Sequence, residues 1–294
     1  MKTDQRLKDG SYHDLRSAGF SCHQLNRNDH NSHINCNSAS SVKGRVYLVG
    51  AGPNDPELLT LKALRVIKRA DVIVYDRLVN REILNFAPVH CQRIYVGKRC
   101  GQPSLEQQEI SRLLVEFAVL GKTVVRLKGG DPFIFGRGGE EALMLAKHNL
   151  EYQVIPGITA AIGCAASSFI PLTHRQVARS VTLVTGQVVT GALPAWSQLV
   201  NAGQTLVFYM GLEKSEQISA GLMEYGLSGD FPLAIVTHGC SPQQIVHVTS
   251  LDQLVSKANE LKGVSPALII LGEVVKLRKE LQTTVESVIS QEEV

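Results

Sequence analysis

The stretch RLKGGDPFIFGRGGEE, residues 126–141, decides how the middle of this chain folds. It begins at the end of an apolar run at residues 123–127 and leads into a helical pattern at residues 140–148. A buried strand, a glycine-rich turn and a helix, in this order, are the repeating unit of an α/β layer. The stretch packs five glycines, three cations and three acids into sixteen positions. This density argues against an ordinary surface loop, and we interpret the stretch as part of a ligand site.

The residue types in this stretch indicate what the ligand site could hold. Glycines let the backbone approach a ligand closely. The carboxylate of Asp131 could accept hydrogen bonds from a ribose or an amine. The side chains of Phe133, Ile134 and Phe135 could form the wall of a pocket for a flat or apolar group.

The same order of elements precedes the stretch. Residues 46–49 are an apolar run that ends in a turn at Gly50 and Gly52, which predicts a strand. Asp55 then resembles an N-cap and Pro56 the first residue of a helix over residues 57–69. Residues 72–75 predict the next strand, and Asp76 stands at its carboxyl end.

The order continues to the end of the chain. Further strands are predicted at residues 152–155, 181–185, 206–209, 233–237 and 267–271, and further helices around residues 110–117, at 215–225 and at 251–261. Ser104 with Gln107, and Ser250 with Gln253, have the spacing of capping boxes. Because the rhythm restarts after Gly157, we expect two α/β domains with a cleft between them, at residues 44–157 and 158–280. Residues 1–43 are predicted to be a disordered or loosely attached polar tail, and residues 281–294 a C-terminal tail.

Composition excludes several classes of protein. Of 294 residues, 44% are hydrophobic, which is typical of a globular chain. The net charge of +3 is too small to indicate nucleic-acid binding. No apolar run reaches the roughly 18 residues of a membrane helix. Six cysteines without a CxxC pair predict reduced thiols in a cytoplasm, no metal, and no thiol in a context that lowers its pKa.

The turn at Gly50 and Gly52 also allows a different enzyme class. A Gly-x-Gly turn between a strand and a helix, with Asp76 where a ribose-binding acid would stand, resembles an NAD-binding fingerprint. Two residues oppose this interpretation. Asp55 occupies the place of the third glycine, and Pro53 stiffens the turn and removes an amide donor that a pyrophosphate would use.

Eight segments, taken together, resemble the tetrapyrrole methylases, and among them most strongly the uroporphyrinogen-III C-methyltransferases. The resemblance covers about residues 44–279, and its most specific pair is GGDPFIFGRGGEE with LTHR. It implies two successive methyl transfers from S-adenosylmethionine to uroporphyrinogen III, giving precorrin-2 by way of precorrin-1 for sirohaem or cobalamin biosynthesis. It also implies a homodimer. Because the dehydrogenase–chelatase domain of some relatives is missing, we expect methylation alone. The segments are residues 50–60, 74–79, 97–99, 129–141, 156–160, 171–175, 209–211 and 265–275.

The resemblance also implies the site residues. Asp76 would accept the proton that the methylated ring loses and Lys98 would donate one, although Lys98 could equally clamp a substrate carboxylate. Eight substrate carboxylates call for a cluster of cations, since arginine binds carboxylates with two hydrogen bonds. The residues implied for substrate binding are Arg77, Arg99, Arg137, Glu140 and Arg175, with Arg81 nearby. Those implied for S-adenosylmethionine, whose product is S-adenosylhomocysteine, are Pro53, Gly129, Gly130, Asp131, Ile134, Thr159, Ala160, Met210 and Gly239.

Two positions depart from the family pattern. Asn54 replaces a glycine, so its backbone should either avoid positive φ or use the tolerance of asparagine for it. Gln187 stands where histidine is common, which puts the role of that position in doubt. Two further functions remain open, a tetrapyrrole carrier and an RNA methylase. Both Asp76 and Lys98 are present, which disfavours the carrier, and no basic stripe with interleaved aromatics supports the RNA methylase.

Overall fold

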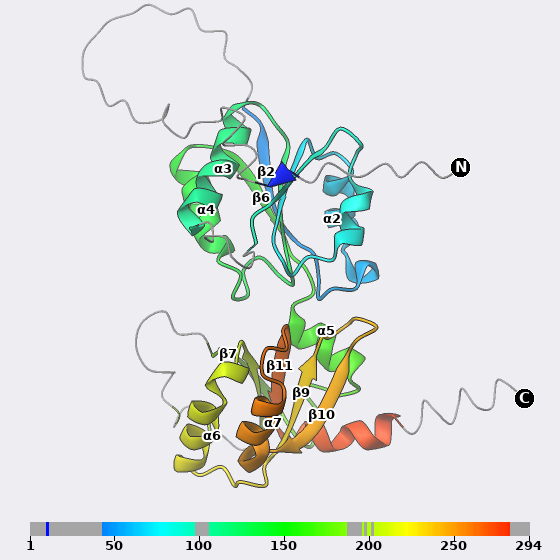
Figure 1. Cartoon of the computed structure of the whole chain (residues 1–294), viewed down its shortest axis with the longest axis vertical. Coiled ribbons are helices and arrows are strands. Elements are labelled where there is room, and N and C mark those ends of the chain that lie inside the picture. The colour runs from blue at the N-terminus through cyan, green and yellow to red at the C-terminus, as the bar shows by residue number, and fades with distance from the viewer. Residues whose placement is uncertain are drawn as a thin grey trace, which may run out of the picture. The chain divides into compact units, whose positions relative to one another are not determined.

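The computed structural model describes residues 10–11, 43–97, 106–186, 196, 199–200 and 203–282. These residues belong to two compact units, each built on one β-sheet (Figure 1). The first unit includes Pro56–Gly157 and the chain up to Gly52, and the second includes Ile158 onward together with the short segment Pro53–Asp55. Two α/β units confirm the predicted fold class.

The first unit has an all-parallel sheet. Its strand order is β1-β4-β3-β5-β2-β6, and every neighbouring pair runs parallel. Parallel sheets are covered on both faces, and all residues of β3 and β5 are buried. The strands are β1 (Gly10–Ser11), β2 (Arg45–Gly50), β3 (Val72–Tyr75), β4 (Gln92–Tyr95), β5 (Val124–Lys128) and β6 (Glu151–Ile155).

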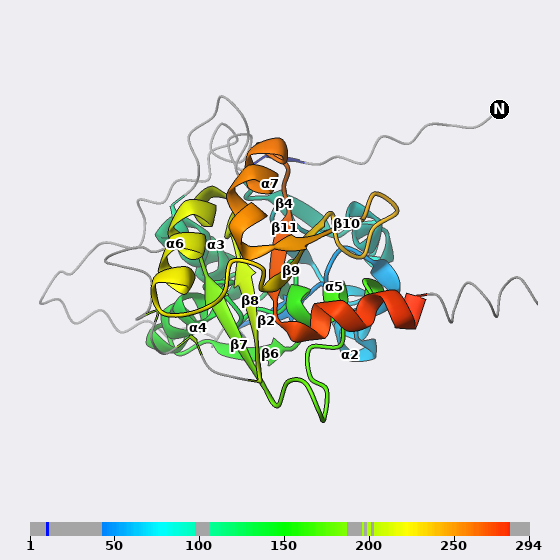
Figure 2. The same ribbon diagram turned by 90° about the horizontal axis from the view of Figure 1, so that it is seen from below.

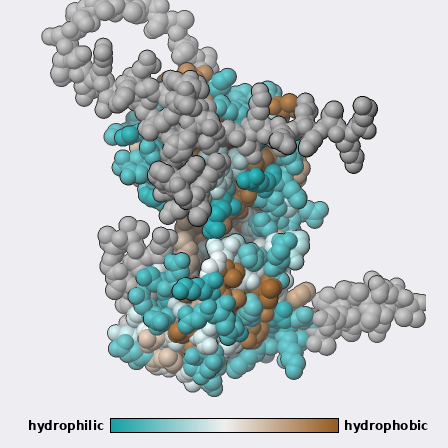
Figure 3. All heavy atoms as spheres, in the orientation of Figure 1, coloured by the Kyte–Doolittle hydropathy of each residue, from teal (hydrophilic) through white to brown (hydrophobic). Residues whose placement is uncertain are grey.

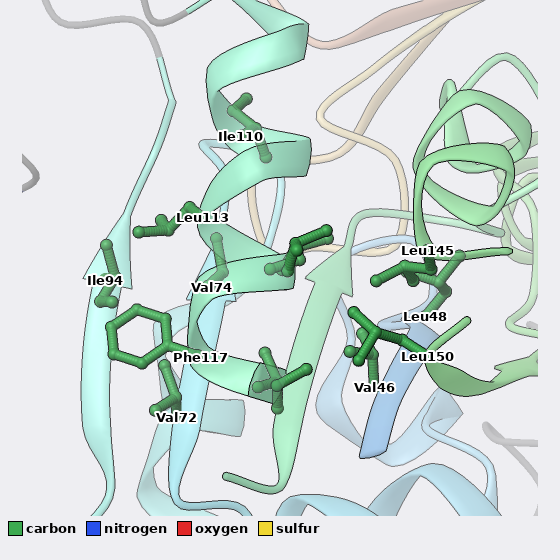
Figure 4. Packing of buried hydrophobic residues seen from close by; sticks show 14 of the residues in the cluster. Val46, Leu48, Val72, Val74, Ile94, Ile110, Leu113, Phe117, Leu145 and Leu150 are labelled. Atoms are coloured by element: carbon green, nitrogen blue, oxygen red, sulfur yellow. The ribbon is translucent and has the colours of Figure 1, made fainter. Parts of the chain in front are cut away.

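Helices cover the two faces of this sheet separately. The helices α3 (Gln107–Val119) and α4 (Gly138–Lys147) pack on one face, and α2 (Leu61–Ile67) with the 3-10 helix η3 (Arg81–Phe86) packs on the other. Figure 4 shows the first of these cores, where Phe117 of α3 lies against Val72 and Ile94 of the sheet. Each face therefore has its own hydrophobic core.

At three helix starts the structure differs from the prediction. Residues 56–58 form the separate 3-10 turn η2 (Pro56–Leu58), and α2 begins at Leu61 because the Thr60 hydroxyl accepts a hydrogen bond from the Ala63 amide at 3.1 Å. In α3 the reciprocal capping pair is Glu106 with Glu109, whereas Ser104 lies outside the described residues. At Ser250 the predicted box is absent, since its hydroxyl bonds to Asp252.

The second unit has a mixed sheet in the order β10-β9-β11-β8-β7, in which only β7 and β8 run parallel. Figure 2 shows α6 and α7 on one side of this sheet and α5 on the other, in agreement with its two cores. The edge strand β10 was not predicted from the sequence, because none of its residues is fully buried and it therefore has no continuous apolar run. The elements are α5 (Ala160–Ser167), β7 (Ser180–Thr185), β8 (Gln204–Tyr209), α6 (Ser215–Glu224), β9 (Pro232–Thr237), β10 (Ile245–Ser250), α7 (Leu254–Glu260) and β11 (Ala267–Leu271).

Among the described residues visible in Figure 3, hydrophilic residues predominate and apolar residues lie in small groups. Among the residues described, no helix combines the length and the apolar character needed to cross a membrane. Of the predicted N-terminal tail, the structure describes only Gly10–Ser11, which pairs with β4 at the edge of the first sheet, and Lys43.

Candidate functional site

The carboxyl edge of the first sheet contains a topological switch point between β2 and β5. These strands are neighbours, but the chain leaves β2 toward α2 on one face and leaves β5 toward α4 on the other. In open α/β sheets, ligands bind where adjacent connections diverge in this way. The two glycine-rich segments identified in the sequence begin at these two strand ends.

Glycine backbones meet at this switch point. Gly52 and Gly130 exchange two hydrogen bonds, with N···O distances of 3.2 and 2.8 Å. A Cβ added at Gly157 would lie 2.4 Å from the carbonyl oxygen of Gly130 and 2.7 Å from the Cα of Gly50. Three loops can pack this closely only without side chains, so the glycines fix the shape of the edge.

This packing also argues against the NAD alternative. The amide of Gly52, which a pyrophosphate would need, donates instead to Gly130. In addition, the helix α2 does not begin directly after the turn but at Leu61, beyond a separate 3-10 turn. The helix N-terminus that binds the pyrophosphate in a dinucleotide fold is therefore not placed behind this glycine turn.

A buried ion network lies behind the edge, and the sequence analysis gave its buried members, Arg126, Lys128 and Glu141, no individual role. Residues alternate along β5, so Arg126 and Lys128 point to the face covered by α3 and α4. There the carboxylate of Glu141 accepts from Arg126 Nε at 3.0 Å and from Lys128 Nζ at 3.1 Å. Gln107 of α3 donates to the same oxygen at 3.0 Å. Arg126, Lys128 and Glu141 are all buried, at 2%, 4% and 0% exposure.

The pKa values of the buried groups in this network are set by burial and by the neighbouring charges. Burial alone would raise the pKa of Glu141, but Arg126 and then Lys128 outweigh it, and the pKa lies below its usual range. Burial lowers the pKa of Lys128, and the neighbouring Arg126 lowers it further. For Arg126, burial acts against the charge, and the carboxylates of Glu141 and Asp76 restore it, so its pKa is raised.

Asp76 is the member of this network that meets solvent. Its side chain is 27% exposed, at the carboxyl end of β3. One carboxylate oxygen pairs with Arg126 Nη2 at 3.3 Å, and the other accepts the Leu78 amide at 3.1 Å. The carboxylate is thus oriented on both sides and still accessible, which is the geometry of an acid–base group. Its predicted partner Lys98 lies outside the described residues.

Asp131 organises the glycine-rich loop after β5. Its Oδ1 accepts the Phe133 amide at 2.8 Å, and its Oδ2 accepts the Gly157 amide at 3.0 Å. The side chain therefore ties this loop to the end of β6. Each oxygen keeps capacity for a second hydrogen bond. Gly129, Gly130 and Ile134 of the same loop are partly exposed, so they can be reached by a ligand.

The predicted substrate-binding residues occupy different surroundings. Arg137 and Glu140 are exposed and form a two-bond ion pair with each other, with both N···O distances at 2.7 Å. Arg175, beside the partly buried His174, is exposed in the second unit. Arg77 and Arg81 are exposed near the end of β3. Arg99 lies outside the described residues, as does Gln187.

The second unit brings another set of predicted residues together around the start of α5. The Tyr209 hydroxyl lies 2.6 Å from Thr159 Oγ1 and accepts the Ala161 amide at 2.9 Å. Tyr209 of β8 therefore caps α5. This role could not be predicted, because Tyr209 and α5 lie far apart in the sequence. Thr159 is 8% exposed and the adjacent Ala160 is partly exposed.

Pro53 and Gly239 belong to one tightly packed cluster in this unit. A Cβ at Gly163 would lie 2.4 Å from the Pro53 ring and 3.1 Å from the Cys240 sulfur, and a Cβ at Gly239 would lie 2.2 Å from the Cys164 sulfur. The two sulfurs thus fill the space where side chains at Gly163 and Gly239 would be. This packing places the backbone of Gly239 directly over Cys164.

Several non-glycine residues at these loops adopt positive φ. Asn54 has φ of 80°, so it uses the tolerance of asparagine for the left-handed region, one of the two expected outcomes. Met210 has φ of 54° and is 45% exposed. Phe135, Arg137, His238 and Cys240 are also left-handed. Such conformations cost about 1–3 kcal/mol each and concentrate at functional sites.

The prediction that no cysteine has a lowered pKa is wrong for Cys240. A hydrogen bond from Cys164 outweighs the effect of partial burial and, with a smaller contribution from Ser167, lowers the pKa of Cys240 to about 7. Cys164 shows the opposite shift, because its proton is held in that hydrogen bond and because it is buried. Cys91 is inert for a different reason, since burial raises its pKa to about 11.

Alkylation by iodoacetamide should therefore single out Cys240 from Cys91 and Cys164. Because only the thiolate reacts, we expect half-maximal labelling of Cys240 near pH 7 and little labelling of the other two below pH 9. Peptide mass spectrometry after a pH series measures this directly. Half-maximal labelling of Cys240 at an ordinary thiol pKa of about 8.5 would contradict the assignment.

Known proteins match most of this chain. A family model described as Tetrapyrrole (Corrin/Porphyrin) Methylases matches residues 45–255. A siroheme synthase from Saccharophagus degradans is 51% identical over 246 residues, which are 83% of this chain and 54% of that protein. The chain thus spans about half the length of the curated relatives it matches.

Solved structures match along nearly their whole length. Uroporphyrin III C-methyl transferase from Thermus thermophilus is 40% identical with a TM-score of 0.68, covering 80% of this chain and 94% of that one. The same enzyme complexed with S-adenyl homocysteine matches with the same identity, TM-score and coverage.

Proposed function

The chain belongs to the tetrapyrrole methylase family, and from this premise we propose that it transfers methyl groups from S-adenosylmethionine to carbon atoms of uroporphyrinogen III. The observation that carries the proposal is the Asp76 carboxylate, which is oriented by a buried arginine and exposed at the carboxyl edge of the sheet, on the strand next to the topological switch point. Support comes from the 40% identity to a uroporphyrin III C-methyl transferase that was solved with S-adenyl homocysteine.

The reaction makes modest demands on the side chains. When bound, S-adenosylmethionine would supply an activated methyl group for an electron-rich pyrrole carbon of the substrate, and S-adenosylhomocysteine would be the leaving group. The chain must orient the two reactants, which can contribute several orders of magnitude in rate. It must also take a proton from the methylated ring, and we assign that proton to a carboxylate oxygen of Asp76.

The described residues suit this methyl donor. In the first unit, Gly129, Gly130 and Asp131 present backbone and a carboxylate at the carboxyl edge. In the second unit, Pro53, Thr159, Ala160, Met210 and Gly239 provide small surfaces. Met210 combines an exposed apolar side chain with a strained backbone, as expected for a ligand contact. We propose that these residues, with Ile134, hold the methyl donor.

Calorimetry separates this proposal from the oxidoreductase alternative. S-adenosylhomocysteine should bind with one site per chain, and NAD should give no heat of binding. A second assay should detect S-adenosylhomocysteine release that requires uroporphyrinogen III. Binding of NAD without binding of S-adenosylhomocysteine would overturn the proposal, and binding of the tetrapyrrole without turnover would favour the carrier.

Asp131→Ala should weaken S-adenosylhomocysteine binding by about 10- to 100-fold, or about 1.4–2.8 kcal/mol. The substitution removes the acceptor of the Phe133 and Gly157 amides and so frees the glycine loop. Asp71→Ala is a matched control, because Asp71 also accepts a backbone amide, from Thr123 at 2.7 Å, but at the amino edge of the sheet. Equal affinity in wild type and Asp131→Ala would remove Asp131 from the site.

Arg137→Ala should raise the KM for uroporphyrinogen III about tenfold while the Kd for S-adenosylhomocysteine stays unchanged. A charge-assisted hydrogen bond to a carboxylate is worth about 1.5–3 kcal/mol, and Glu140 now occupies the fork that a substrate carboxylate would take. Lys257→Ala, which breaks an i,i+3 ion pair in the second unit, is the control. An unchanged KM would show that Arg137 serves only its pair with Glu140.

The wider setting follows from the family resemblance. We propose that the enzyme makes precorrin-2 through precorrin-1 for sirohaem or cobalamin biosynthesis, in the cytoplasm and as a homodimer. Light scattering during size-exclusion chromatography of the full chain tests the homodimer.

A further inference from the structure

Fold stability alone does not explain the buried ion network behind Asp76. Replacing a buried ion pair by apolar residues of similar volume is often neutral or stabilising. Here three donors converge on one oxygen of Glu141, while its second oxygen is buried and has no hydrogen-bond partner among the described residues. A network arranged only for stability would use both oxygens, so the arrangement points to a role for its most exposed member, Asp76.

Arg126 is held in one orientation. Its Nε donates to Glu141 at 3.0 Å, and its Nη1 donates to the carbonyl oxygens of Val74 and Leu127 at 3.3 and 3.1 Å. Because the guanidinium is planar and rigid, these bonds fix the direction of its Nη2, which contacts Asp76 at 3.3 Å. Glu141, together with these two carbonyl oxygens, thus determines where Arg126 presents its charge to Asp76.

The network also balances the charge around Asp76. The strand β5 contributes two positive side chains, Arg126 and Lys128. The helix α4 contributes the negative Glu141, and α3 contributes the neutral Gln107. On the segment of Asp76 itself, Arg77 is exposed. An arginine alone would make Asp76 a weaker base, since an opposite charge within about 4–6 Å favours the carboxylate. Glu141 offsets this effect by engaging both buried cations.

We propose that Arg126 and Glu141 are positioning residues, which together orient the Asp76 carboxylate and set its basicity for removing the proton from the methylated ring. The inference rests on the proposed function, because it requires Asp76 to be the base. It predicts opposite effects for the two residues. Loss of Arg126 makes Asp76 more basic, and loss of Glu141 leaves Arg126 uncompensated and makes Asp76 less basic.

The test is the pH dependence of kcat/KM for wild type, Arg126→Gln and Glu141→Gln, with S-adenosylmethionine saturating. Activity should rise with pH as the base that takes the ring proton becomes deprotonated. We expect this acid limb to move up by roughly one pH unit in Arg126→Gln and down by roughly one unit in Glu141→Gln, with kcat lowered at least tenfold in both. Glu151→Gln, which breaks an exposed pair with Arg45, should keep the wild-type limb.

Each outcome decides one claim. A purely structural role would lower activity without moving the two limbs in opposite directions, so limbs at the wild-type position, or moved the same way, overturn the inference. Absence of turnover in the wild type would instead overturn the proposed function. Substrate carboxylates titrate alike with every variant, so they do not affect the comparison.

Conservative variants keep the inference testable if the glutamine variants fail to fold. Arg126→Lys and Glu141→Asp retain both charges but change the geometry by which Arg126 reaches Asp76. We expect kcat to fall about tenfold with the acid limb and the KM unchanged. Wild-type kcat in both variants would overturn the positioning role.

Discussion

Asp76→Asn is expected to lower kcat by about 10²–10⁴-fold, the usual contribution of a positioned acid–base group. The amide cannot accept the proton from the methylated ring, although its oxygen can still accept the Leu78 amide and so preserve the loop. The dissociation constant for S-adenosylhomocysteine should stay within a factor of about two, because no cofactor contact is assigned to Asp76. Initial rates of S-adenosylhomocysteine release measure the first effect, and calorimetry measures the second.

A suitable control for Asp76→Asn stands at the other end of the same strand. Asp71 precedes β3, and its carboxylate accepts a backbone amide just as that of Asp76 does. Asp71→Asn should therefore reproduce any general effect on β3 and leave turnover near the wild-type value. If Asp76→Asn retained most of its activity, another group would have to accept the proton.

Glu141→Ala should destabilise the fold by about 3–5 kcal/mol, as is typical when one partner of a buried ion pair is removed. The substitution leaves Arg126 and Lys128 buried behind the sheet with Asp76 as their nearest counter-charge. Urea denaturation at pH 7 measures the difference. The exposed pair of Arg45 and Glu151 gives the comparison, since solvent screens this pair and Glu151→Ala should cost far less stability than Glu141→Ala.

The stability difference should depend on pH with a definite sign. The folded-state pKa of Glu141 is lowered, so its contribution is fully present above the unfolded value of about 4.3. It is lost as the pH falls through the lower folded-state value. The gap between wild type and Glu141→Ala should therefore be complete at pH 7 and narrow below about pH 4. A difference under 1 kcal/mol at pH 7 would show that the cluster tolerates loss of its acid.

The strands could be predicted from the sequence because most are buried apolar runs. The prediction for residues 72–75 matches β3, and that for residues 267–271 matches β11. The strand β4 was not identified, because two of its four residues, Gln92 and Arg93, are polar. Helix starts were less predictable, since Asp55 and Thr60 are both good capping residues and the structure uses Thr60.

The buried network could have been suspected but not assigned from sequence. Glu141 stands four residues before the buried Leu145 and so shares its helix face. Arg126 and Lys128 alternate with apolar residues along β5. What the pattern could not show is that these faces meet. The role of Tyr209 and the lowered pKa of Cys240 likewise depend on residues far apart in the sequence.

The central claim is methyl transfer to carbon of a tetrapyrrole, and the mass of the product tests it most directly. The full chain should be incubated without oxygen with freshly prepared uroporphyrinogen III and S-adenosylmethionine carrying a deuterated methyl group. We expect mass spectrometry to show a tetrapyrrole with one labelled methyl group at early times and two at late times. A tetrapyrrole of unchanged mass, under conditions where S-adenosylhomocysteine binds the chain, would contradict the account.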